Sequence, residues 1–172
     1  MIVIEPPSSG TGDAGAFKSL RKPELARFLV RAKKAVGVLG EVTVLLCDDT
    51  RIKGLNKDFR GKNKATDVLS FPMGENPEGA LGDLAVSVDT AARQAAEHGH
   101  GLDEELRILL LHGLLHLAGL DHEADAGEMR ERETELRAKL KLPAGLIERT
   151  LPVRKRLKAP VPPKTAGKKV VR

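Results

Sequence analysis

The sequence contains no tryptophan and no tyrosine, and only four phenylalanines. This scarcity excludes an RNA-binding domain that stacks bases on several aromatic side chains of a β-sheet. The one cysteine, Cys47, cannot form an internal disulfide or build a zinc cage from thiolates. No apolar run approaches the ~18 residues that a membrane span requires, and the first residues lack the pattern of a signal peptide. We therefore expect a cytoplasmic protein that does not bind a membrane.

Acidic residues are missing from the C-terminal segment. From Arg149 to Arg172 there are nine Lys or Arg and no Asp or Glu. The rest of the chain has 20 basic residues against 24 acidic ones, so the net charge of +5 arises in this segment. We predict a single domain over residues 1–151 and a disordered basic tail over residues 152–172. The tail either binds a polyanion such as RNA or is only a solubilising extension.

The length of 172 residues is sufficient for one domain with a hydrophobic core. Hydrophobic periodicity predicts a loop over residues 6–16 and helices over about 23–36, 49–59, 89–98, 103–118 and 124–140. It predicts short strands over residues 2–5, 41–47, 66–71 and 81–88. Strands and helices are mixed without strict alternation, which indicates an α+β fold with a small mixed sheet.

Several local expectations follow from helix-capping rules and side-chain chemistry. Asp48 or Asp49 caps a helix in which Ile52, Leu55 and Phe59 share one face, and Asp89 caps the alanine-rich helix that follows. His98 and His100 flank Gly99 at a helix end, where we expect them to be exposed to solvent. Cys47 is expected to be a buried small hydrophobic residue.

Most of the chemistry lies in residues 112–122, HGLLHLAGLDH. His112 and His116 are four residues apart, so they project from the same face of an apolar helix. Gly119 permits a left-handed turn, which would bring His122 back to the same point. Three converging imidazoles match a catalytic zinc site whose fourth position is left for water, although nickel or copper would also suit. The alternative is a set of ordinary buried histidines.

The motif H-G-x-L-H-L-x-G-x-D-H resembles the signature of the YbeY family, single-strand-specific metallo-endoribonucleases of bacterial rRNA maturation. Two further stretches are similar to this family: Leu55–Pro72, LNKDFRGKNKATDVLSFP, and Leu81–Asp83 followed by a strand. The resemblance covers about residues 20–142 of the chain. It implies a mixed four-stranded sheet packed with helices, a zincin-like single domain related to zinc metalloproteases.

The resemblance also implies roles for particular residues. His112, His116 and His122 would hold one zinc ion per chain, and Arg60 would be an active-site arginine, whose planar fork suits a phosphate. The alternative for Arg60 is an ordinary surface cation. Asp121 would either orient a ligand imidazole or form a turn.

The implied substrates are single-stranded RNA and rRNA, and the implied partners are the ribosome or ribosomal proteins. The implied role is 3′-end maturation of small-subunit rRNA and ribosome quality control, with no DNA substrate expected. One alternative is a ribosome assembly factor with a structural metal site, although structural zinc is usually held by four protein ligands.

A metallopeptidase is the other alternative, because the histidine spacing matches the H-E-x-x-H-x-x-G-x-x-H proteases. In this chain Gly113 replaces the glutamate that serves those enzymes as general base. Gly113 either leaves room for a bulky phosphodiester or permits close helix packing. The missing glutamate weighs against a peptidase.

Overall fold

The computed structural model describes residues 1–7, 12–74, 79–122 and 125–143. Its centre is a four-stranded sheet in the order β1-β2-β4-β3. The strands are β1 (Ile2–Ile4), β2 (Glu41–Cys47), β3 (Val68–Pro72) and β4 (Ala80–Ser87). β1, β2 and β4 are parallel, whereas β3 pairs with β4 in the antiparallel direction. The sheet is therefore mixed, as predicted, and β3 is one of its edges.

The helices confirm the α+β class. They are α1 (Ala14–Ser19), α2 (Lys22–Val36), α3 (Asp49–Arg60), α4 (Val88–His98), α5 (Leu102–Leu117) and α6 (Glu128–Leu140). The predicted loop over residues 6–16 is wrong at its end, because Asp13 caps α1 by accepting hydrogen bonds from the Gly15 and Ala16 amides. No helix in the described part of the chain combines the length and apolar character needed to cross a membrane. The predicted tail over residues 152–172 lies outside the described residues.

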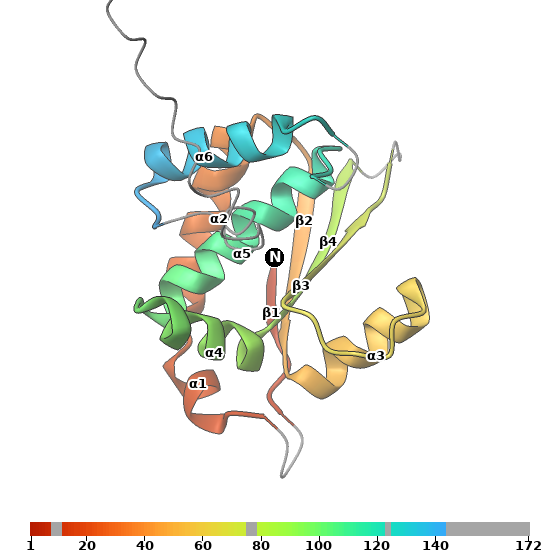
Figure 1. The fold of residues 1–172 in the computed structure, drawn as a ribbon, viewed down its shortest axis with the longest axis vertical. Helices are drawn as coiled ribbons and strands as arrows, with labels where there is room; N and C mark the ends of the chain where they lie inside the picture. The colour runs from red at the N-terminus through yellow and green to blue at the C-terminus, as the bar shows by residue number, and fades with distance from the viewer. Residues whose placement is uncertain (8–11, 75–78, 123–124, 144–172) are drawn as a thin grey trace, which may run out of the picture.

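The two faces of the sheet are covered differently. Figure 1 shows α3 on one side of the sheet and α2, α4, α5 and α6 on the other. Alternate residues of β2 divide between these faces, as the pleat of a strand requires. Val42, Val44 and Leu46 join the large core with α2 and α5. Leu45 and Cys47 join a smaller core under α3. Burial raises the pKa of the Cys47 thiol to about 12, as expected for an inert buried cysteine.

Helix α5 lies at the centre of the larger layer and is buried around almost its whole circumference. Its leucines Leu109, Leu110, Leu111, Leu114 and Leu115 are all 0% exposed. Gly113 lets the helix approach the sheet closely, since a Cβ atom there would lie 2.8 Å from Leu84 Cδ2 in β4. The Ser70 hydroxyl in β3 donates a 3.4 Å hydrogen bond to the Gly113 carbonyl. Gly113 therefore allows α5 to pack closely against β4.

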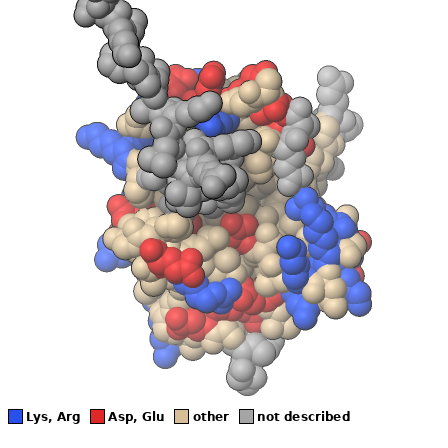
Figure 2. Space-filling view, viewed as in Figure 1, with Lys and Arg blue, Asp and Glu red and all other residues tan. Residues whose placement is uncertain are grey.

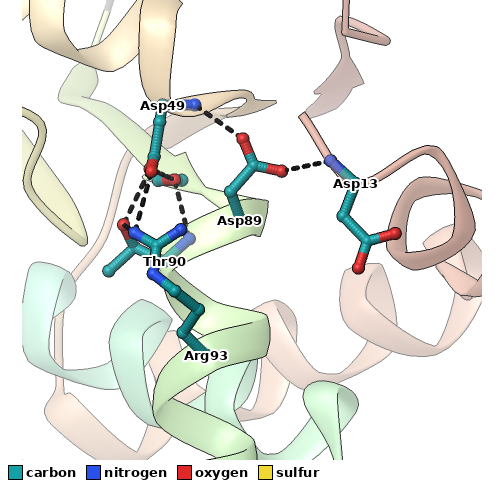
Figure 3. Close-up of polar contacts among 6 residues, drawn as sticks. Asp13, Asp49, Asp89, Thr90 and Arg93 are labelled. Atoms are coloured by element: carbon teal, nitrogen blue, oxygen red, sulfur yellow. Dashed lines mark hydrogen bonds and ion pairs between the residues drawn. The ribbon is translucent and has the colours of Figure 1, made fainter. Parts of the chain in front are cut away.

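Asp89 does not cap α4, contrary to the prediction. The cap is Ser87, whose hydroxyl accepts a hydrogen bond from the Thr90 amide. Asp89 is buried, and its carboxylate accepts hydrogen bonds from the backbone amides of Asp13 at 2.7 Å and Asp49 at 3.0 Å (Figure 3). One carboxylate from α4 thus satisfies amides at the start of both α1 and α3.

The Asp49 side chain provides a second link between α3 and α4. It accepts hydrogen bonds from Ser87, Thr90 and Arg93. Figure 3 shows Thr90 and Arg93 converging on it. Burial by itself would raise the pKa of Asp49, but these hydrogen bonds and the arginine charge hold it below its ordinary value. These contacts fix the N-terminal end of α3 and hence the direction in which the helix leaves the sheet.

The two histidines at the end of α4 differ from each other. His98 is exposed, as predicted. The prediction for His100 is wrong, because its side chain is only 10% exposed and its Nε2 contacts the fully buried carboxylate of Glu105 in α5. A buried carboxylate needs such a partner, so His100 belongs to the packing of α4 against α5.

Candidate metal centre and its cleft

His112, His116 and His122 come together at the C-terminal end of α5. The helix ends because Gly119 adopts a left-handed conformation with φ of +87°. The Gly119 amide donates to the His116 carbonyl at 3.0 Å, and the Leu120 amide donates to the Leu115 carbonyl at 3.1 Å. This is the predicted chain reversal, and it returns His122 toward the two helical histidines.

The spacing of the three imidazoles fits a single metal ion. The ligand atoms all lie within 4.8 Å of one another. The Nε2 atoms of His112 and His116 are 3.2 Å apart. Two nitrogens on a tetrahedral zinc, each about 2.0–2.1 Å from the ion, are separated by roughly 3.3 Å. The helical pair therefore already has the spacing that a tetrahedral ion requires.

The electrostatics of the cluster also suit a metal ligand set. Burial, followed by the neighbouring His112 and His122, lowers the pKa of His116, while Asp121 acts in the opposite direction. A lowered pKa keeps His116 neutral, which is the form that binds metals. Within the described residues, His112 Nδ1 and His122 Nδ1 are buried without a hydrogen-bond partner. The unmatched His122 Nδ1 fits a metal ion as its missing partner. His112 Nδ1 points to the other side of its ring from Nε2, so it cannot bind the same ion.

Glu133 of α6 is a site residue that the sequence did not reveal. The residue is 1% exposed, and its Oε2 lies 3.6 Å from His112 Nδ1. A carboxylate on the far side of a ligand imidazole fixes the orientation of the ring and raises its basicity. Glu133 lies 21 positions after His112, so no local spacing could have identified it.

The histidines form one end of a cleft of about 760 Å³ that follows the edge strand β3. The lining residues come from α5, the turn after it, β3 with its preceding loop, and the end of α3. They are Phe59, Arg60, Thr66, Asp67, Val68, Leu69, Ser70, Phe71, Pro72, His112, His116, Gly119, Leu120, Asp121 and His122. The cleft thus contains all the predicted site residues: the three histidines, Arg60 and Asp121. The roles of Arg60 and Asp121 stay predictions.

The fold and the cleft define a class of protein. It combines an α+β fold and a mixed sheet with a three-histidine cluster that could hold a metal ion at the end of a buried helix. Residues 14–141 match the family described as "Endoribonuclease YbeY". The chain belongs to this family.

Curated relatives support the assignment. The protein named Endoribonuclease YbeY of Koribacter versatilis is 60% identical over 126 residues, which cover 73% of this chain and 82% of the relative. The protein of the same name from Solibacter usitatus is 48% identical over 146 residues, which cover 83% of this chain and 97% of the relative.

A solved structure is also similar, the solution structure of TM1509 from Thermotoga maritima. It is 33% identical, with a TM-score of 0.49, and the match covers 81% of this chain and 89% of that chain.

Proposed function

We propose that this protein is a zinc-dependent endoribonuclease that cleaves single-stranded RNA during rRNA processing. The observation that carries the proposal is the cluster of His112, His116 and His122 in a cleft whose wall also contains Arg60. Membership of the Endoribonuclease YbeY family supports a phosphodiester substrate. We extend the proposal to 3′-end maturation of small-subunit rRNA and to ribosome quality control, because the family motifs in the sequence imply these roles.

The residues of the chain have separate tasks in this proposal. The three histidines would hold one zinc ion, and Glu133 would hold the His112 ring in the orientation that binding requires. Zinc would supply a Lewis acid that activates water or neutralises charge on the phosphate. Arg60 would bind two phosphate oxygens through its guanidinium fork, which orients the scissile bond in the cleft.

The structure weakens the peptidase alternative on a further ground. A glutamate in place of Gly113 would begin with a Cβ atom 2.8 Å from a Leu84 methyl, where α5 packs on the sheet. A general base at this position would therefore require the Leu84 side chain to shift. The assembly-factor alternative predicts a metal site closed by four protein ligands, whereas the cluster within the described residues contains three.

The direct test is cleavage by the purified protein with zinc added and with zinc removed by a chelator. Single-stranded RNA, duplex RNA and casein are offered separately. We expect zinc-dependent fragments from single-stranded RNA only, together with one zinc per chain by elemental analysis. A His116→Ala preparation purified in parallel controls for contaminating nucleases. Intact RNA with zinc-loaded protein would favour the assembly factor, and digestion of casein would favour the peptidase.

A further inference from the structure

Phe59, the second-last residue of α3, is an aromatic side chain exposed to solvent. Its helical spacing from Ile52 and Leu55 predicts a buried position, but it is 68% exposed. Figure 1 shows the C-terminal end of α3 at the periphery of the fold. A single exposed hydrophobic residue is common on protein surfaces. Phe59 differs because it lines the same cleft as the histidine cluster.

A second phenylalanine supports this ring. Phe71 of β3 meets Phe59 in an edge-to-face contact, with ring centroids 5.1 Å apart and planes at 72°. Phe71 is half-buried against the small core under α3, so it provides a fixed base. The contact restrains the Phe59 ring and leaves most of its surface open to the cleft.

The surface around Phe59 is basic. Besides Arg51, which pairs with Glu5, five exposed cations lie on α3 and in the loop that follows it: Lys53, Lys57, Arg60, Lys62 and Lys64. Figure 2 shows Lys and Arg gathered over α3. Among the described residues, none of these five lies within ion-pair distance of a carboxylate. An exposed aromatic ring within a field of unpaired cations is the combination that binds single-stranded nucleic acid.

We propose that Phe59 is a base-stacking residue of the cleft: an unpaired base of the RNA lies on its ring while Arg60 and neighbouring lysines hold the flanking phosphates. This inference rests on the proposed function and adds a reason for strand selectivity. A base in a duplex is already paired and stacked, so only a single strand can place a base on Phe59 without the cost of unpairing. Because every base has a π-face, the contact tolerates any sequence.

The chain lacks tryptophan, so Phe59→Trp introduces a single fluorophore at this position. The probe is a short single-stranded RNA with 2′-O-methyl riboses, which binds without being cleaved. We expect the RNA to quench the fluorescence of Phe59→Trp strongly and to bind this variant at least as tightly as the original chain. The matched control is Val30→Trp on α2, which is 69% exposed and lies beside Arg27 and Arg31. Equal quenching at the two positions would overturn the proposal, because stacking would then not be specific to the cleft.

The second measurement is the RNA affinity of variants that lack the Phe59 ring. Phe59→Ala should weaken binding of the single-stranded probe by about 5- to 150-fold, corresponding to one lost stacked base. Phe59→Leu should not restore binding, whereas Phe59→Tyr should. Binding of duplex RNA and the slope of log affinity against log salt should stay unchanged, since no phosphate contact is lost. Unchanged affinity for single strands in Phe59→Ala would overturn the proposal.

The cleavage and binding measurements together distinguish a failure of the stacking role from a failure of the proposed function. If the unmodified protein cleaves RNA and Phe59→Ala binds and cleaves equally well, only the stacking role fails. If the unmodified zinc-loaded protein cleaves no RNA, the proposed function fails, and the quenching and affinity measurements still decide whether Phe59 contacts a base.

Discussion

Helix α5 and helix α3 cover opposite faces of the same sheet and differ in how deeply they are buried. The central residues of α5 are enclosed by α2, α4, α6 and the sheet, whereas only Ile52 and Asn56 of α3 are buried. The buried helix carries two of the three histidines, and the exposed helix carries Arg60 and Phe59. The two layers therefore suit different tasks. A buried, well-packed helix holds ligand side chains in a fixed geometry, whereas an exposed basic helix can bind a large anionic substrate.

The cleft lies where these two layers meet, along the edge strand β3. An exposed strand edge is normally a hazard, because its unpaired backbone groups can bind another strand. Here the ends of α5 and α3 place histidines and an arginine along this strand. The site is thus assembled from elements of both layers, and each layer can be perturbed separately.

The largest expected effect on metal binding and cleavage comes from substitution of a histidine in the buried helix α5. His116→Ala should remove the bound metal and abolish RNA cleavage, because two imidazoles hold zinc much more weakly than three. The melting temperature of the zinc-loaded protein should fall, since binding to the native state no longer contributes to stability. Elemental analysis and thermal melts provide the measurements, with the exposed His98→Ala as control. A full equivalent of zinc retained by His116→Ala would contradict the three-histidine assignment.

A matched pair of leucines compares the packing of the two layers directly. Leu114→Ala in α5 should cost about 2–5 kcal/mol of unfolding free energy, because it creates a cavity at a fully buried position. Leu55→Ala in α3 removes the same atoms from a half-buried position and should cost about 1 kcal/mol. Urea unfolding of the metal-free proteins measures both without a contribution from zinc. Equal losses would show that α3 is packed as tightly as α5.

Substitution of Arg60 on the exposed helix α3 should change RNA cleavage but not folding. Arg60→Ala should keep the metal and the melting temperature and lower kcat on the order of 100-fold, because the phosphate loses its fixed cation. Arg60→Lys should recover little, since an ammonium lacks the planar fork. Lys34→Ala removes an equal charge from the exposed surface of α2 and serves as control. Similar kcat values for all four proteins would remove Arg60 from the mechanism.

Some of the features on which these predictions depend could be predicted from the sequence, and others could not. The strand Glu41–Cys47 is predicted at its observed position, and the observed cap Asp48 is one of the two predicted candidates, because alternation and capping are local signals. The convergence of the three histidines is also predicted, since one helical turn and one left-handed glycine determine it. Such features can be predicted because they depend on only a few residues that are close in sequence.

Other features could not be predicted because they depend on partners that local patterns do not contain. The role of Asp89 is set by the backbone amides of Asp13 and Asp49, which are remote from it in sequence. His100 is buried because the Glu105 carboxylate contacts it across the turn between α4 and α5. Phe59 has the spacing of a core residue, yet it is 68% exposed, because the sheet and its neighbours leave the end of α3 uncovered, which helical spacing alone does not show.

Substitution of Glu133 should perturb the candidate metal centre less than loss of a histidine does. Glu133→Gln keeps the shape of the side chain but removes the negative charge 3.6 Å from His112 Nδ1. We expect zinc affinity to fall about 10- to 100-fold, the usual consequence of losing a carboxylate behind a ligand imidazole. Competition with a fluorescent chelator measures the affinity, and circular dichroism checks the fold. Glu131→Gln, an exposed residue of the same helix, is the control, and equal affinities in the two variants would exclude the orienting role.

The smallest expected effect concerns the basic tail. Deletion after Leu151 removes eight of the nine cations found from Arg149 to Arg172. If the tail follows the phosphate backbone of an RNA, affinity should fall, and the slope of log affinity against log salt should shrink by up to ~0.7 for each lost contact on a single strand. Cleavage of a short substrate already bound should change little, because the histidines and Arg60 are retained.

A matched control makes this last test specific. A chain whose tail is scrambled but keeps its composition should restore both the affinity and the salt slope, because counterion release depends on the number of charges rather than on their order. A tail with glutamine at every lysine and arginine should behave like the deletion. Equal affinity and equal salt slope for the full and truncated chains would mean that the tail contributes nothing to the electrostatic attraction and is only a solubilising extension.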